Sequence, residues 1–333
     1  MSASMSPREN FLACLQHKPH EFTPAFFDMA PCGLFQPFER GEGGMGVDAF
    51  GVRWVAPTSG GFAAALPAPN EFKVKDITKW RDDVTIPDVS GYDWAAAAER
   101  DLAHFDRDKQ VLECVSQNFV YERLAAMMGF EEALLAMALE PEAAFEFMEA
   151  VVNWKIEVLK YYVKYYQPDL YTFCDDVATE RMLFMAPATY RELIKPLHKK
   201  MVDAASELGV PVFQHTCGKA DLLVQDMLDE GNVGWNAVQP TNDIQSIIEQ
   251  HGDNFVIMGG YNTNGAPGQL SATEAEVRAE VRRCFADYAK YGRAYIFMGS
   301  VLQPLNPENP FDMGPLNAAL TDEFFKCRAE QLQ

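Results

Sequence analysis

The sequence predicts an α/β fold in which one (β/α)8 barrel, of the TIM type, takes up all 333 residues. Two observations lead to this prediction. From residue 94 onward, helical stretches alternate with short apolar runs that end in small or polar residues. Apolar runs between helices indicate parallel strands that are covered on both faces. With the N-terminal candidates there are about eight such strands, which favours a closed barrel over an open sheet.

The predicted elements follow one another along the chain. The first helix begins after Ser6, which can cap it, has Pro7 in its first turn and continues to Leu15. The apolar runs that we predict to be strands are residues 22–28, 110–115, 170–174, 212–214, 237–238, 255–258 and 294–298. The later helices are expected near residues 95–106, 119–129, 131–138, 141–165, 188–208 and 273–290.

The first 90 residues have a different character. A glycine-rich segment occupies residues 41–46, and residues 59–95 are rich in proline and glycine with weak periodicity. No internal repeat or convincing linker separates this region from the rest of the chain. We therefore expect residues 1–90 to cover the mouth of the barrel as part of a single domain, residues 1–333.

Composition excludes several classes of function. Apolar residues make up 48% of the chain, as in a globular protein with a large core. The 48 acidic and 28 basic residues give a net charge of −20, which repels nucleic acids and anionic membranes. Seven scattered cysteines without a CxxC pair, and the absence of a signal peptide or membrane span, indicate a cytoplasmic protein with reduced thiols.

The first candidate for chemistry is His215-Thr216-Cys217-Gly218, at the end of the predicted strand 212–214. Side chains alternate along a strand, so His215 and Cys217 are expected on the same side. An imidazole and a thiol that share a face can bind a borderline metal, above all zinc. The alternative is a buried histidine bonded to the backbone beside an inert cysteine, and the spacing alone does not decide between the two.

Other predicted strands also end in polar groups. Asp175 and Asp176 follow the strand at 170–174, Tyr261 and Asn262 follow the strand at 255–258, and Ser300 follows the strand at 294–298. Barrel enzymes carry their sites at the carboxyl ends of the strands. Two neighbouring carboxylates are more often a cap or a turn, but the position at a strand end favours a chemical role for one of them.

The order of these segments resembles the uroporphyrinogen decarboxylase superfamily over nearly the whole chain, and the resemblance implies a (β/α)8 barrel. The matching pieces are Pro7-Arg8-Glu9, the segment 48–54, Asp175-Asp176, the segment 190–196, His215-Thr216-Cys217-Gly218 and Gly259-Gly260. The superfamily holds decarboxylases and cobalamin-dependent methyltransferases, so the resemblance alone does not assign a reaction.

Two features of the sequence favour the methyltransferase branch. The decarboxylases carry an arginine-rich loop after the first strand, which binds substrate carboxylates, whereas residues 28–35 contain no arginine. The methyltransferases bind zinc through His-x-Cys and a further cysteine on the last strand. His215 and Cys217 match the first two ligands, and Ser300 stands where the third is expected.

The resemblance therefore implies a corrinoid-dependent methyltransferase. It would move a methyl group from a methoxylated aromatic compound to the reduced cobalt of a corrinoid (cobalamin) carried by a partner protein, and zinc would act as a Lewis acid on the ether oxygen. A homodimer is one expected assembly. The candidate substrate-binding residues are Phe27, Asp28, Phe35 and Phe50. The candidate catalytic residues are Asp176, Asn262 and Tyr261.

The third zinc ligand has to come from a neighbouring strand end. Cys174, Asp176 and Glu180 follow the same strand, and we expect a carboxylate, Asp176 first and Glu180 second, because it leaves zinc a better Lewis acid. Three other functions stay open. They are methyl transfer from a methyl-corrinoid to a thiol, a porphyrinogen-type decarboxylation, and an inactive barrel that only binds a corrinoid or a partner.

Overall fold

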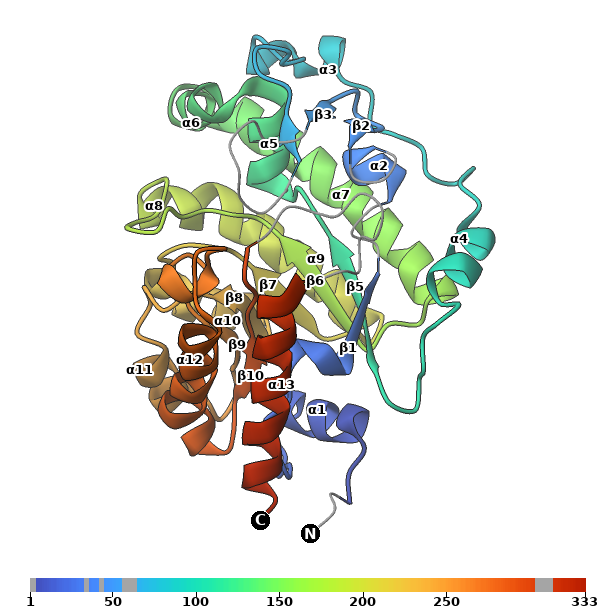
Figure 1. Ribbon diagram of the computed structural model, residues 1–333. Coiled ribbons are helices and arrows are strands. Elements are labelled where there is room, and N and C mark those ends of the chain that lie inside the picture. The colour runs from blue at the N-terminus through green and yellow to red at the C-terminus, as the bar shows by residue number, and fades with distance from the viewer. Residues whose placement is uncertain (1–3, 33–35, 42–44, 56–64, 303–313) are drawn as a thin grey trace.

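The central element of the protein is a curled sheet of seven parallel strands, seen in a computed structural model that describes residues 4–32, 36–41, 45–55, 65–302 and 314–333 (Figure 1). The strand order is β1–β5–β6–β7–β8–β9–β10, so each strand after β1 pairs with the next one along the chain. The strands are β1 (Met29–Cys32), β5 (Val111–Ser116), β6 (Leu170–Cys174), β7 (Val212–His215), β8 (Gly234–Val238), β9 (Val256–Gly260) and β10 (Tyr295–Met298).

The sheet closes on itself between β10 and the segment that precedes β1. Ala25 forms a parallel bridge with Phe297, and the backbone N–H of Phe297 donates to the carbonyl of Pro24 at 2.9 Å. A short 3-10 turn, Phe26–Asp28, then separates this bridge from β1. The closed ring of parallel strands confirms the predicted α/β barrel. The first strand, expected at residues 22–28, is replaced by this bridge and turn, and β1 begins at Met29.

Apolar side chains fill the interior of the barrel. Alternation along each strand points every second residue inward, and these residues form one buried cluster with α1 (Pro7–Leu15). Helix α1 lies across the lower end of the strands in Figure 1, with the capping box of Ser6 and Glu9 at its start, as predicted. The strand residues of this cluster are Met29, Val111, Leu170, Phe213, Val256, Met258 and Ile296.

Helices surround the barrel, and those expected from the sequence are present within a few residues of their predicted ends. Helices α11 (Ile244–His251) and α13 (Gly314–Gln331) lie outside the predicted ranges. Among the residues that the structure describes, no helix combines the length and the apolarity needed to cross a membrane. The helices are α4 (Trp94–Asp101), α5 (Val120–Met128), α6 (Phe130–Leu139), α7 (Pro141–Tyr165), α8 (Pro187–Thr189), α9 (Lys195–Glu207), α10 (Val224–Glu230), α11 (Ile244–His251), α12 (Glu274–Asp287) and α13 (Gly314–Gln331).

The N-terminal segment lies on the side toward which β1 and β5 run, next to α5, α6 and α7 (Figure 1). Its described elements are the short helices α2 (Pro37–Arg40) and α3 (Trp80–Asp83) and an antiparallel sheet of β2 (Gly46–Val47), β3 (Arg53–Val55) and β4 (Leu66–Pro67). That this segment and the barrel form a single domain stays a prediction.

Two fully buried ion pairs attach this segment to the barrel helices. Arg123 on α5 pairs with Asp48, and Lys155 on α7 pairs with Glu39. The Asp48 carboxylate also accepts a hydrogen bond from Trp54 Nε1 at 2.8 Å. Charges buried in this way are tolerated only when each is paired and hydrogen-bonded, so removal of one partner leaves a costly charge behind.

We predict that Asp48→Ala lowers the free energy of unfolding by about 3–5 kcal/mol, because Arg123 then stays buried without its partner. Urea unfolding followed by circular dichroism measures the change. Glu71→Ala is the matched control, since Glu71 pairs with Arg53 in an exposed ion pair and should leave the curve close to that of the wild type. A two-step curve in which Asp48→Ala shifts only one step would contradict the single domain.

Candidate metal centre

The ends of β6 and β7 bring their polar residues together. Cys174 on β6 is level with His215 on β7, and the backbone N–H of Asp175 continues the pairing by donating to the His215 carbonyl at 3.0 Å. Parallel neighbours end at the same edge of a sheet, so the residues that follow both strands share one place at the barrel mouth. Asp176 and Cys217 are the residues that turn toward His215 there.

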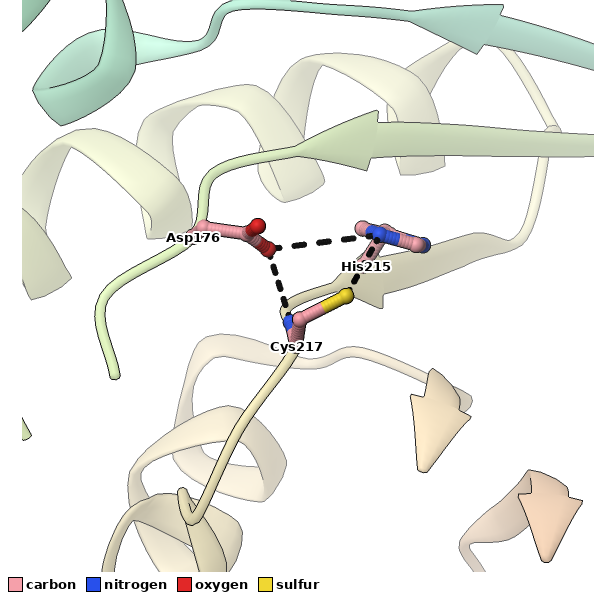
Figure 2. Close-up of side chains that lie close together, drawn as sticks. All are labelled: Asp176, His215 and Cys217. Atoms are coloured by element: carbon pink, nitrogen blue, oxygen red, sulfur yellow. Dashed lines mark hydrogen bonds and ion pairs between the residues drawn. The ribbon is translucent and has the colours of Figure 1, made fainter. Parts of the chain in front are cut away.

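Asp176, His215 and Cys217 form a compact cluster of metal-ligating groups (Figure 2). The Cys217 sulfur lies 3.6 Å from His215 Nε2, and Asp176 Oδ1 lies 4.0 Å from the same nitrogen. The three ligand atoms all lie within 4.8 Å of one another. Asp176 Oδ1 also accepts the backbone N–H of Cys217 at 2.7 Å, which holds the loop after β7 against the loop after β6.

These distances suit a zinc ion. Ligands bound at about 2.0–2.3 Å around a tetrahedral zinc lie roughly 3.5 Å apart, close to the spacing of the cluster. All three side chains are only partly buried, so they have room to move slightly when a metal ion binds. One carboxylate, one imidazole and one thiol leave a fourth position for water or a substrate, as in catalytic zinc sites.

Asn236 on β8 orients the imidazole. Its Oδ1 lies 2.6 Å from His215 Nδ1, and an amide oxygen can only accept a hydrogen bond. His215 therefore carries its proton on Nδ1 and presents the lone pair of Nε2 to Asp176 and Cys217. Metal-binding histidines usually donate the N–H of their other ring nitrogen to an acceptor of this kind.

Carboxylates near the cluster change the pKa values of the groups beside them. Burial, and then the carboxylates of Asp176 and Glu122, raise the pKa of the Cys217 thiol well above its ordinary value. Burial and the charge of Asp176 likewise raise the pKa of Glu122 to about 8. A divalent cation between the three ligands would reverse both effects and displace the thiol proton of Cys217.

Asp175 and Asp176 have different environments although they are neighbours. The Asp175 side chain is fully buried and accepts the backbone N–H of Glu122 at 2.8 Å at the start of α5. It also lies 2.8 Å from His198 Nε2 on α9. Of the two carboxylates expected after β6, one thus ties α5 and α9 to the strand end and the other joins the metal-ligating cluster.

The other candidates for the third ligand lie outside the cluster. Glu180, the second choice, is exposed on the loop after β6. Cys174 is level with His215 on the neighbouring strand, but it is not one of the three residues whose ligand atoms lie together in the described part of the chain. The backbone N–H of Ser300 lies 3.4 Å from Thr263 Oγ1. Asp176, the first choice from the sequence, is the residue that the structure brings to His215 and Cys217.

Tyr261 and Asn262 are bound to their own loop. The Tyr261 hydroxyl donates to the carbonyl of Pro267 at 2.8 Å, and its ring is buried. Asn262 Oδ1 accepts the backbone N–H of Gly265 at 3.0 Å. The catalytic role predicted for these two residues stays a prediction, and their contacts are those of residues that shape a loop.

The candidate substrate-binding residues have partners elsewhere in the fold. Asp28 is buried in an ion pair with Arg328 on α13, and the Phe27 ring lies 5.4 Å from that of Phe324 on the same helix. The Phe50 ring is buried 4.9 Å from that of Trp154 on α7. Phe35 lies outside the described residues. A role of these residues in substrate binding stays a prediction.

The sequence reasoning missed Asn236. The predicted strand began at Ala237, whereas β8 begins at Gly234 and places Asn236 level with His215. Asn236 is the single amide in an otherwise apolar strand, and this strand pairs with the strand that carries His215. That pattern could have identified Asn236 from the sequence. A polar side chain at such a position needs a partner inside the barrel.

Comparisons with known proteins assign the fold and the family. Among solved structures, a methyltransferase from Methanosarcina mazei matches with a TM-score of 0.71 at 14% identity, over 98% of this chain and 99% of that chain, which shows a shared fold. A family 5 xyloglucanase from Paenibacillus pabuli matches only weakly, with a TM-score of 0.36 at 11% identity over 73% of this chain and 70% of that chain. Comparison with curated proteins gives no match.

The sequence profile described as uroporphyrinogen decarboxylase (URO-D) matches residues 122–307. This range is more than half of the chain, and it contains β6, β7 and all three residues of the metal-ligating cluster. The chain therefore belongs to the uroporphyrinogen decarboxylase (URO-D) family.

Proposed function

We propose that this chain is a methyltransferase that takes the methyl group of a methoxylated aromatic compound and transfers it to the reduced cobalt of a corrinoid on a partner protein. The observation that carries the proposal is the cluster of Asp176, His215 and Cys217 at the strand ends of a URO-D family barrel. The likeness to a fold neighbour described as a methyltransferase, over nearly the full length of both chains, supports the transfer of a methyl group.

The donor set favours an ether oxygen as the group to be activated. Zinc held by Asp176, His215 and Cys217 would supply Lewis acidity at the oxygen of the scissile methyl ether. A carboxylate donates less electron density than a second thiolate would, so this set suits a Lewis acid better than an activated thiolate. Within the part of the chain that the structure describes, the cluster contains one cysteine and no second one, which is the reason to place ether cleavage ahead of thiol methylation.

The residues of the chain have separable tasks in this proposal. Asn236 holds the imidazole of His215 in one tautomer, and the Asp176 carboxylate holds the Cys217 backbone. Asp175 fixes the end of β6 against α5, so that Asp176 is presented from a rigid element. Because these hydrogen bonds hold the ligands at the strand ends, the side chains need to move little when a metal ion and a substrate bind.

We predict that purified wild-type protein contains about one zinc per chain, and that Asp176→Ala, His215→Ala and Cys217→Ala each lose most of it, because three ligands are the usual minimum of a catalytic zinc site. Elemental analysis measures the content. Glu180→Ala and Ser300→Ala are the controls and should keep their zinc. Loss of zinc from Ser300→Ala alone, or a wild type without metal, would contradict this assignment of the ligands.

We predict that Asn236→Ala weakens zinc binding by about 10- to 100-fold, because His215 loses the acceptor that orients it. Competition with a chromophoric chelator measures the dissociation constant. Asn236→Asp should bind zinc at least as well as the wild type, since a carboxylate also accepts from Nδ1. Asn254→Ala, at an exposed position, is the control. An unchanged affinity of Asn236→Ala would show that the hydrogen bond has no part in metal binding.

We predict that the protein, mixed with methoxylated aromatic compounds and a reduced corrinoid protein, produces the absorbance of methyl-cobalt. His215→Ala and Cys217→Ala should lose about 100-fold or more of this rate with the fold kept, because the metal supplies several kcal/mol of transition-state stabilisation. If methyl-cobalt instead disappears when a thiol is added, the protein methylates thiols. Full activity in both variants would exclude this metal centre from the reaction.

A further inference from the structure

Glu113 on β5 is, within the described ranges, a buried carboxylate that no basic side chain approaches to ion-pair distance. Every other buried carboxylate among the residues that the structure describes has such a partner. These carboxylates and their partners are Asp28 with Arg328, Glu39 with Lys155, Asp48 with Arg123, Asp175 and Glu230 with His198, Asp226 with Arg191, and Glu323 with Arg278. A buried carboxyl group without such a partner is costly as an anion, so burial favours its protonated form.

The Glu113 side chain points into the barrel. Val111, two residues earlier on β5, belongs to the buried interior cluster, and alternate residues of a strand share one face. The Glu113 carboxylate accepts a hydrogen bond from the hydroxyl of Thr172, which points inward on β6 for the same reason. On its other side Glu113 is level with Pro31 of β1, which is exposed. An inward-facing position beside Glu113 is therefore open to solvent.

Glu113 lies one layer of side chains below the metal-ligating cluster, on the side away from the barrel mouth. Thr172, which binds it, is followed two residues later by Cys174, and Cys174 is level with His215. Two residues of a strand rise by about 6.6 Å, so a small group bound at the cluster is within reach of Glu113 directly or through one water. Burial raises the pKa of Glu113, and the hydrogen bond from Thr172 and the charge of His215 lower it by less. The influence of His215 agrees with a carboxyl group that faces the cluster.

The proposed reaction consumes one proton. When an aryl ether loses its methyl group, the C–O bond breaks and its electron pair stays on the oxygen as a phenolate. A phenol has a pKa of about 10, so the product leaves as the protonated phenol near neutral pH. Asp176 and Cys217 cannot supply this proton, because both are deprotonated as metal ligands. The donor therefore has to be another acid that faces the cluster.

We propose that the carboxyl group of Glu113 donates this proton to the phenolate oxygen, directly or through one water. This role rests on the proposed function. The methyl group forms its Co–C bond with both electrons of cobalt(I), which becomes methyl-cobalt(III), so no further oxidant or reductant is needed. Glu113 becomes a carboxylate and regains its proton from solvent beside Pro31. Glu122 is a less suitable acid, because burial and the charge of Asp176 raise its pKa and a bound cation would offset the second effect.

The test compares two ethers whose phenolates differ in their need for a proton, 4-methylanisole and 4-cyanoanisole. Glu113→Gln keeps the size of the side chain but has no acidic proton to transfer. It should form methyl-cobalt from 4-methylanisole about 100-fold or more slowly than the wild type. The loss should be much smaller with 4-cyanoanisole, because the cyano group stabilises the phenolate. Thr172→Val should show a weaker effect of the same kind, and Glu207→Gln, at an exposed position, is the control.

Two measurements do not depend on turnover. The infrared difference spectrum between the wild type and Glu113→Gln should contain the C=O band of a protonated carboxyl group, and both proteins should contain the same amount of zinc. Absence of the band, or loss of zinc from Glu113→Gln, would overturn the role of proton donor.

The rates separate this role from the alternatives. Equal losses with both ethers in Glu113→Gln, or no loss with either, would also overturn it. A loss that depends on the ether in Glu122→Gln and not in Glu113→Gln would assign the proton to Glu122 and make this assignment wrong. A wild type that demethylates neither ether contradicts the proposed function itself, and the role of Glu113 falls with it.

Discussion

The candidate centre depends on one buried carboxylate, that of Asp175. It accepts backbone N–H groups from the start of α5 and lies 2.8 Å from His198 Nε2 on α9, and the Asp175 backbone donates to the carbonyl of His215. Two helices and two strand ends thus meet at a single side chain. A carboxylate removed from water needs hydrogen-bond partners for both of its oxygens. These partners fix Asp175, and the next residue, Asp176, is thereby placed next to His215.

The hydrogen-bond network extends from Asp175 into the layer of helices. His198 Nδ1 lies 3.1 Å from the Tyr190 hydroxyl, which donates to Glu230 on α10 at 2.8 Å. All four side chains are buried, and burial raises the pKa of Glu230 to about 7. Because the helices carry these partners, the position of the metal-ligating cluster is set by the packing of α9 and α10 as well as by the sheet. The mouth of the barrel is therefore more rigid than a set of surface loops would be.

The sequence was sufficient for the architecture and for the prediction that Asp176, His215 and Cys217 lie close together, because both follow from local rules. Apolar runs between helices indicate a parallel barrel, and alternation along β7 places His215 and Cys217 on one side. Asp176 could be chosen ahead of Glu180 from its position directly after a strand. Each of these predictions uses only residues that are close in sequence, or the fact that parallel strands end at a common edge of the sheet.

The remaining features depend on contacts between distant parts of the chain. Asp28 looks like a residue of the barrel mouth in sequence, but Arg328, 300 positions away, holds it in the core. The difference between Asp175 and Asp176 depends on α5 and α9, and no local pattern distinguishes the two carboxylates. Asn236 was missed because the start of β8 was placed too late.

The most direct measurement is X-ray absorption at the zinc edge of the metal-loaded protein. The account predicts one sulfur ligand at about 2.3 Å, from Cys217, and the remaining ligands as nitrogen or oxygen at about 2.0–2.2 Å. Substitution of Cys217 by serine should remove the sulfur signal entirely. Two or more sulfur ligands, or none, would contradict a centre built from Asp176, His215 and Cys217.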